Sequence, residues 1–196
     1  MRKLSVFNHV SLDGYFVDAH GGMSWAHKQD PEWNAFLEGN ASGGGVLMFG
    51  RVTYDLMTMY WPTPMAARDN PTVAKKMNEM PKIVVSRTMD KAAWDNTTVI
   101  KSDLTASTRK LKQSPGDDIV ILGSGNIIAQ LASEGLIDAY QLVVNPIVLG
   151  NGRTLFEGVK DPLGMKLTST RAFRNGSVLL CYDHMITARP IARDAH

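Results

Sequence analysis

Short apolar segments recur along this chain, and each is followed by a turn or by a helical segment. They are rich in β-branched residues and too short to be buried helices, so each indicates a buried strand. The predicted strands are Leu4–Val10, Val46–Phe49, Lys82–Ser86, Thr97–Ile100, Ile119–Leu122 and Tyr140–Val144. Strands that alternate with helices are joined by right-handed crossovers, which makes a sheet mostly parallel and covers both of its faces. The sequence therefore predicts an α/β fold of three layers, with helices on both faces of a mostly parallel central sheet.

Helix-start signals fill the intervals between these strands. Asp30 before Pro31 has the pattern of an N-cap followed by proline at the first helical position, and Asp103 has the pattern of a cap for a later helix. The predicted helices are 31–40, 53–59, 71–79 and 104–113, with a further one that opens at Gly123-Ser124-Gly125 and ends at Gly135. Trp61–Asn70, which contains two prolines, is expected to be a loop.

The C-terminal part of the chain has the pattern of a hairpin. Lys166–Arg174 and Ser177–Asp183 flank Asn175-Gly176, the turn dipeptide of tight hairpins. They predict two antiparallel strands at one edge of the sheet. No repeat or change of composition divides the chain, so we expect a single domain over residues 1–185 and a C-terminal tail over residues 186–196.

The amino-acid composition excludes several classes of protein. A chain of 196 residues with 44% hydrophobic residues can bury a sizeable core without disulfides or metals, and it is not disordered. The formal net charge of +2 comes with no basic cluster, so we expect no nucleic-acid partner. The single cysteine, Cys181, excludes a disulfide framework, and the longest apolar run, Val178–Tyr182, is too short to span a membrane. We expect a cytoplasmic protein.

Three segments that follow predicted strands have the composition of phosphate-binding turns. They are Gly50-Arg51-Val52-Thr53, Ser86-Arg87-Thr88 and Gly123-Ser124-Gly125-Asn126. Ligands of open α/β sheets bind at the carboxyl ends of the strands, where helix N-termini offer free N–H groups and arginine adds charge-assisted contacts. Each segment alone is a weak signal, because such turns also use glycine and serine for structural reasons. Three of them in one domain predict a site for a large phosphorylated ligand.

A series of motifs in order resembles the dihydrofolate reductase superfamily, and most of all its branch with the reductase domain of riboflavin biosynthesis. The motifs are Ser11-Leu12-Asp13-Gly14-Tyr15, Met23-Ser24-Trp25 with Asp30, Leu47–Tyr54, Val85-Ser86-Arg87, Ile100-Lys101-Ser102, Ile121–Gly125 and Asn145–Gly152. The resemblance covers nearly the whole chain, from Lys3 to about Asp183. It implies a dihydrofolate reductase-like three-layer fold and an NADPH-dependent reductase of a small heterocycle.

The resemblance also implies where NADPH would bind. The adenosine 2′-phosphate would lie near Arg51, Ser86 and Arg87, and the adenine near Lys101 and Ser102. The other implied cofactor residues, which would hold the pyrophosphate and the nicotinamide ribose, are Gly50, Thr53, Gly123, Ser124, Gly125, Asn126 and Ile127. No Asp or Glu falls within residues 49–54 or 84–89, which favours NADPH over NADH. By the same resemblance, the peptide bond between Gly123 and Ser124 is expected to be cis.

Two carboxylates are candidates for a catalytic acid. Asp30 follows Trp25 by five residues, as the acid of dihydrofolate reductase follows a tryptophan, but the same residue has the pattern of a helix cap. Glu32 is the second candidate. Asp13, Trp25 and Asn145 are candidates for substrate contact. No metal is expected, because no two of the five histidines have ligand spacing.

The expected activity is that of an NADPH-dependent reductase, most like 5-amino-6-(5-phosphoribosylamino)uracil reductase of riboflavin biosynthesis or a dihydrofolate reductase-like enzyme. The alternative is an NADP(H)-binding protein of the same fold that has no turnover and acts as a binder or regulator. A homodimer is also expected. The riboflavin-type branch pairs its subunits through edge strands, and Tyr140–Val148 has the apolar composition of an exposed edge that needs covering.

Overall fold

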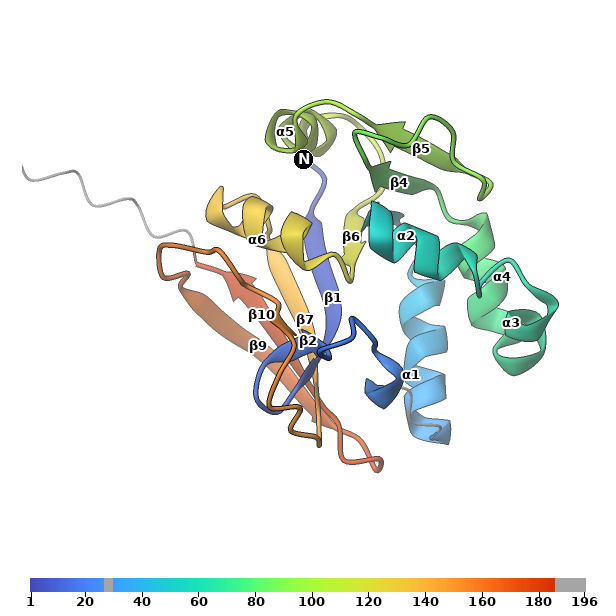
Figure 1. Cartoon of the computed structure of the whole chain (residues 1–196), viewed down its shortest axis with the longest axis vertical. Coiled ribbons are helices and arrows are strands. Elements are labelled where there is room, and N and C mark those ends of the chain that lie inside the picture. The colour runs from blue at the N-terminus through green and yellow to red at the C-terminus, as the bar shows by residue number, and fades with distance from the viewer. Residues whose placement is uncertain (27–29, 186–196) are drawn as a thin grey trace, which may run out of the picture.

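An eight-stranded sheet runs through the molecule, with its strands in the order β5-β4-β3-β6-β1-β7-β10-β9 (Figure 1). The computed structural model describes residues 1–26 and 30–185. The strands are β1 Leu4–Ser11, β3 Val46–Gly50, β4 Lys82–Val85, β5 Thr97–Ile100, β6 Ile119–Leu122, β7 Ala139–Asn145, β9 Met165–Ala172 and β10 Val178–His184. All neighbours from β5 to β7 are parallel, and β10 is antiparallel to β7 and β9. The predicted parallel sheet with a C-terminal hairpin is confirmed.

Helices cover both faces of the sheet. They are η1 Ser24–Ala26, α1 Pro31–Ser42, α2 Arg51–Thr58, α3 Pro64–Asp69, α4 Pro71–Glu79, α5 Leu104–Gln113 and α6 Gly125–Ser133. On one face, Val6 and Ile121 share a core with Ile128 of α6, and Leu111 of α5 packs against it. On the other face, the strands β3 and β4 pack against α4, and β7 and β10 pack against Trp33 of α1. The three layers that the sequence predicts are therefore present.

The prediction that Trp61–Asn70 forms a loop is wrong for part of this segment. Residues 64–69, inside the expected loop Trp61–Asn70, form the short helix α3. Thr63 is its N-cap and accepts a hydrogen bond from the Ala66 N–H at 3.3 Å. Pro64 occupies the first turn, where the N–H that proline lacks has no partner within the helix anyway. The proline therefore starts a helix here and does not interrupt one.

A second, two-stranded sheet was not predicted. It joins β2, Tyr15–Val17, to β8, Arg153–Thr154. Both strands are very short, and they lie far apart in the sequence. Neither carries a local pattern that predicts a strand, so only the folded chain brings them together.

The strand at the edge of the sheet is also not the one that the sequence predicts. β7, which overlaps Tyr140–Val148, is hydrogen-bonded to β1 on one side and to β10 on the other. The edge of the sheet on this side is β9, whose residues 166–172 are exposed. The expectation of an exposed apolar edge at Tyr140–Val148 is therefore wrong, because the C-terminal hairpin covers it.

The order of the strands creates the place for a site. β6 lies next to β3, yet the chain leaves β6 toward α6 on one face, whereas it leaves β3 toward α2 on the other face. Neighbouring connections that leave in opposite directions open a crevice at the carboxyl ends of the strands. Within residues 1–26 and 30–185, no helix is both long and apolar enough to cross a bilayer.

Candidate functional site

The turns that follow β3 and β6 meet at the carboxyl edge of the sheet. The Gly50 N–H donates a hydrogen bond to the Ser124 hydroxyl oxygen at 2.7 Å. The same hydroxyl lies 3.0 Å from the Thr53 hydroxyl, to which it donates. A Cβ added to Gly50 would lie 3.3 Å from the Ile127 side chain, so the two turns are in close contact. The structure therefore brings together predicted cofactor residues that are more than 70 positions apart.

The turn between β6 and α6 is built from two consecutive left-handed residues. Gly123 has φ +56° and Ser124 has φ +65°, and the peptide bond between them is trans. The expected cis bond is therefore wrong, because the left-handed pair makes the reversal. A Cβ on Gly123 would lie 2.9 Å from the Thr53 methyl carbon, closer than such atoms pack. Glycine is required here by its conformation and by the close approach of α2.

The two helices that follow these turns, α2 and α6, lack a side-chain cap. The residues before α2 and α6, Gly50 and Ser124, make no capping hydrogen bond with their side chains. By contrast, Asp30, Thr63 and Asp103 cap α1, α3 and α5. α4 also has no side-chain cap, but it begins with a proline. First-turn N–H groups without a cap attract anions, so the two uncapped helices make the edge suitable for phosphate groups.

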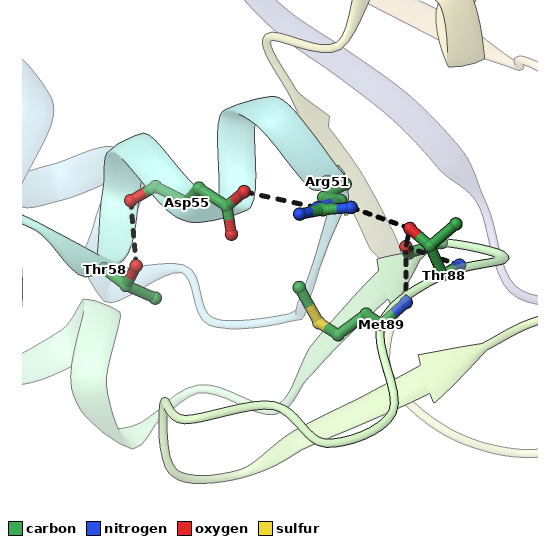
Figure 2. A network of polar contacts seen from close by, with 6 residues as sticks. Arg51, Asp55, Thr58, Thr88 and Met89 are labelled. Carbon is green, nitrogen blue, oxygen red and sulfur yellow. Dashed lines mark hydrogen bonds and ion pairs between the residues drawn. The ribbon is translucent and has the colours of Figure 1, made fainter.

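An arginine network lies beside these turns (Figure 2). Arg51, at the start of α2, donates from Nη1 to the Thr88 hydroxyl at 2.7 Å and pairs through Nε with Asp55 at 3.5 Å. Its side chain is 55% exposed and can reach a ligand. The Ser86 hydroxyl is buried and accepts from the N–H groups of Thr88 and Met89 at 3.3 and 3.1 Å. Ser86 therefore shapes the loop after β4, and Thr88, to which the resemblance gives no role in cofactor binding, holds Arg51.

Two further cations lie at the same edge. β4 and β5 are parallel with Val85 opposite Ile100, which places Lys101 next to Ser86 and Arg87. Lys101 pairs with Asp90 at 2.6 Å, and this ammonium lowers the pKa of the Asp90 carboxyl. Arg87 is exposed.

The Ser102 hydroxyl lies 2.9 Å from that of Ser107. Lys101 and Ser102 line a surface depression together with residues of α5. The structure thus places the predicted 2′-phosphate residues and the predicted adenine residues along one edge of the sheet.

The start of α6 is covered by a part of the chain that sequence reasoning did not assign. The Phe16 ring lies against Gly125, where an added Cβ would be 2.7 Å from the ring. Arg153 donates to the Asn126 side-chain oxygen at 2.6 Å, and its guanidinium lies 5.9 Å from the centre of the Phe16 ring. Phe16 and Arg153 arrive through the β2–β8 pairing, which has no local sequence signal. The Ile127 side chain is buried and its N–H donates to the Ser124 carbonyl oxygen, so Ile127 supports the turn from within.

The two candidate acids have different surroundings. Asp30 is the N-cap of α1, and its Oδ1 accepts from the Trp33 N–H at 3.0 Å. Glu32 pairs with Arg171 of the C-terminal hairpin at 3.0 Å and accepts from the Arg174 N–H at 3.4 Å. The hydrogen bond from Arg171 holds the pKa of the Glu32 carboxyl below its usual value. Glu32 is therefore an ionised anchor for the hairpin, whereas the carboxylate of Asp30 caps α1.

The predicted substrate residues have structural partners. Asp13 accepts from Ser11, Leu149 and Gly150, and the Ser11 hydroxyl is the largest of the causes that lower the pKa of Asp13 to about 2. These bonds hold the 11–14 turn against the 147–150 loop.

Asn145 is 1% exposed, and its Nδ2 donates to the carbonyl oxygens of Val10 and Val143. The Trp25 indole donates to the Gly22 carbonyl oxygen at 3.2 Å. Direct substrate contact by these three residues stays a prediction, and the burial of Asn145 favours a structural role. Among the residues that the structure describes, no three His, Cys, Asp or Glu side chains form a group that could hold a metal ion.

Solved structures share this fold. The "Putative riboflavin biosynthesis protein" from Shewanella sp. PV-4 matches with a TM-score of 0.72 and 23% identity, over 93% of this chain and 99% of that one. The diaminohydroxyphosphoribosylaminopyrimidine deaminase/5-amino-6-(5-phosphoribosylamino)uracil reductase from Thermotoga maritima matches with a TM-score of 0.66 and 12% identity, over 94% of this chain and 57% of that one. Because both sequence identities are low, these matches show only that the fold is shared. It is the dihydrofolate reductase-like fold of the riboflavin-type branch.

Sequence comparison is more specific. Residues 2–179 match the family model of the RibD C-terminal domain. The uncharacterized protein YyaP of Bacillus subtilis (strain 168) is 31% identical over 184 residues, which cover 92% of this chain and 94% of YyaP. The chain therefore belongs to the RibD C-terminal domain family.

Proposed function

We propose that this protein is an NADPH-dependent reductase of a small pyrimidine- or pteridine-like heterocycle. The family supports a reductase-type oxidoreductase, and the Thermotoga relative of the same fold includes a uracil reductase in its name. The choice of cofactor rests on the site of this chain, and the class of substrate rests on the resemblance to the riboflavin-type branch. The observation that carries the proposal is the meeting of two uncapped helix N-termini with Arg51 at one edge of the sheet.

The residues at this edge fit a dinucleotide that carries an extra phosphate. Arg51, Arg87 and Lys101 supply positive charge along the ends of β3, β4 and β5. No carboxylate falls within residues 49–54 or 84–89, and the carboxylates just beyond them, Asp55 and Asp90, are paired with Arg51 and Lys101. Thr53 and Ser124 present hydroxyls beside the first turns of α2 and α6, where a pyrophosphate would bind.

When bound, NADPH supplies a hydride to the ring of the substrate. The protein orients the two rings and excludes water from them. The Gly123-Ser124 turn sets the distance between the bound nucleotide and β1. Asp30, at the N-terminus of α1, supplies negative charge or a proton to the heterocycle, while Glu32 stays paired with Arg171.

Titration of NADPH and NADH against the wild type and two arginine variants tests the cofactor assignment. A charge-assisted contact is worth about 1.5–3 kcal/mol, so Arg51→Ala or Arg87→Ala should weaken NADPH binding roughly 10- to 100-fold. NADH binding should stay nearly unchanged. The matched control is Arg109→Ala on α5, because Arg109 is similarly exposed and pairs with Glu134 away from this edge. This control should change neither affinity.

The same titrations show which part of the proposal fails. Equal affinity of the wild type for NADH and NADPH would refute the 2′-phosphate site. Equal losses of both cofactors in Arg51→Ala would mean that Arg51 supports the fold or the shared pyrophosphate. Binding of NADPH without oxidation by any member of a panel of pyrimidines and pteridines would favour a binder or regulator over an enzyme.

A further inference from the structure

One buried amide beside the candidate site has an unpaired donor. The Asn8 side chain is 2% exposed, and its Oδ1 accepts from the His9 N–H at 3.0 Å. Within the described part of the chain, the Asn8 Nδ2 has no hydrogen-bond partner. A buried donor without an acceptor destabilises the folded chain, and in native proteins such a group has a specific reason to be retained. Contact with a ligand is such a reason.

The position of Asn8 connects it to the turn between β6 and α6. Phe7 of β1 lies opposite Leu122, the last residue of β6. The two strands are parallel, so Asn8 is level with Gly123, the first residue of the turn. The unpaired Nδ2 is therefore on the part of β1 that lies beside the turn between β6 and α6.

Strand alternation shows which face the amide belongs to. Val6 and Val10, two residues before and after Asn8, belong to the core cluster that includes Ile127 and Ile128 of α6. Phe16 belongs to the same cluster, and its ring lies against Gly125. The side chain of Asn8 is therefore on the side of the sheet where α6 begins.

We propose that Asn8 donates a hydrogen bond from Nδ2 to the carboxamide oxygen of the nicotinamide ring of bound NADPH. The proposal rests on the proposed function. A neutral amide in a nearly water-free position suits a neutral carbonyl oxygen, whereas the phosphates have Arg51 and the helix N-termini. The residues of the β6–α6 turn are expected to hold the pyrophosphate and the nicotinamide ribose, and Asn8 lies beside this turn.

The proposed bond makes Asn8 a residue that determines ligand specificity. Nδ2 has no acceptor among the described residues, and the bound nicotinamide would supply one. A site with such a buried donor discriminates against a ligand that has no acceptor in the same place. Asn8 therefore should contribute to the binding of the nicotinamide end and not to the binding of the adenosine end.

Calorimetric titration of two ligands tests this assignment. NADPH carries the nicotinamide, and adenosine 2′,5′-bisphosphate carries the 2′-phosphate without it. Asn8→Leu keeps a side chain of similar size and removes the donor. It should weaken NADPH binding about 3- to 10-fold, the range for a neutral hydrogen bond, and leave the bisphosphate unchanged. The melting temperature of the free variant should be the same as that of the wild type or higher.

Thr108→Val is the matched control. Thr108 on α5 is fully buried, and its hydroxyl is the other buried side-chain group without a partner in the described structure. It lies in a helix that supplies none of the proposed nicotinamide contacts, so the variant should bind both ligands as the wild type does. Asn8→Ala repeats the comparison with a smaller side chain in case Asn8→Leu does not fold.

Each contrary result has a distinct meaning. Unchanged NADPH affinity in both Asn8 variants would overturn the proposed bond, as would equal losses of NADPH and the bisphosphate. A rise in the KM of the heterocycle with unchanged NADPH affinity would also overturn it, because the amide would then contact the substrate. A wild type that binds neither ligand would refute the proposed function itself.

Discussion

At the scale of single residues, neighbouring carboxylates differ because of what tertiary structure places beside them. Asp30 and Glu32 are two positions apart at the start of α1. Asp30 accepts the Trp33 N–H, whereas Glu32 is bound by Arg171 and by the backbone of Arg174. A carboxyl whose pKa is lowered by an arginine is a poor proton donor at neutral pH. This difference selects Asp30 as the residue to test for catalysis.

Asp30→Asn should separate capping from catalysis. Asparagine caps a helix about as well as aspartate, so the variant should unfold at nearly the same urea concentration as the wild type. Its turnover should fall by about 100-fold or more, the scale for loss of a general acid. The measurement is the rate of NADPH oxidation with a substrate that the wild type reduces.

Glu32→Gln is the control for that experiment. It removes the charge from the pair with Arg171 at the same end of α1. Its turnover should stay close to that of the wild type. Full turnover in Asp30→Asn would assign Asp30 to capping alone.

At the scale of elements, the site depends on how two strand-to-helix turns pack. The left-handed pair at Gly123 and Ser124 lets α6 start close to Thr53 of α2. The attachment of α4 to β4 also depends on a contact between the two elements. Lys82 is almost fully buried at the start of β4, and its ammonium donates to the carbonyl oxygens of Asn78 and Met80 at the end of α4. Burial lowers the pKa of this lysine to about 8.

Gly123→Ala should disrupt the β6–α6 turn. The substitution destabilises the fold for two reasons. The alanine must adopt a left-handed φ, and its Cβ would lie 2.9 Å from the Thr53 methyl carbon. We expect the free energy of unfolding to fall by about 2–4 kcal/mol in urea denaturation, because overpacking adds to the backbone cost. NADPH affinity should fall as well.

Gly158→Ala is the matched control for the turn. Gly158 also has a positive φ, of +91°, but an added Cβ meets nothing within 4 Å. Its loss should be limited to the backbone cost of about 1–2 kcal/mol. Equal losses in the two variants would show that the approach of Thr53 does not constrain Gly123.

At the scale of the whole molecule, the C-terminal hairpin determines which strand lies at the edge of the sheet. β10 covers β7, and β9 becomes the edge of the sheet with Leu167 51% exposed. An edge strand offers unpaired backbone groups to another chain. The dimer expected from the sequence stays a prediction, and β9 replaces Tyr140–Val148 as the segment through which we expect it.

Sedimentation of the wild type and two charged variants tests the dimer. The wild type should sediment as a dimer at micromolar concentration, and Leu167→Glu on β9 should be monomeric, because the charge would be buried in the interface. Leu56→Glu on α2 is the matched control, because Leu56 is also 51% exposed, and it should remain a dimer. A wild type that is only monomeric would contradict the prediction, and a monomeric Leu56→Glu would move the interface to α2.

Much of the fold could be predicted because its signals are local. The buried strands from Leu4 to Asn145 are short apolar runs, and the helices after Asp30 and Asp103 begin at capping residues. The motifs around Arg51, Ser86 and Ser124 fall at strand ends, where any open parallel sheet places its ligands. β2, β8 and α3 were missed because their formation depends on distant pairing or on proline at a helix start.

The sequence by itself determined the three-layer class, the parallel sheet and the edge on which the phosphate-binding turns lie, because periodicity, caps and glycine turns act over a few residues. Tertiary structure alone decided that Thr88 holds Arg51, that Arg171 pairs with Glu32, and that Phe16 and Arg153 cover the start of α6. It also decided that Nδ2 of Asn8 has no hydrogen-bond partner among the residues that the structure describes. These contacts join residues from separate elements, and their strength depends on burial and distance, which no local pattern of residues specifies.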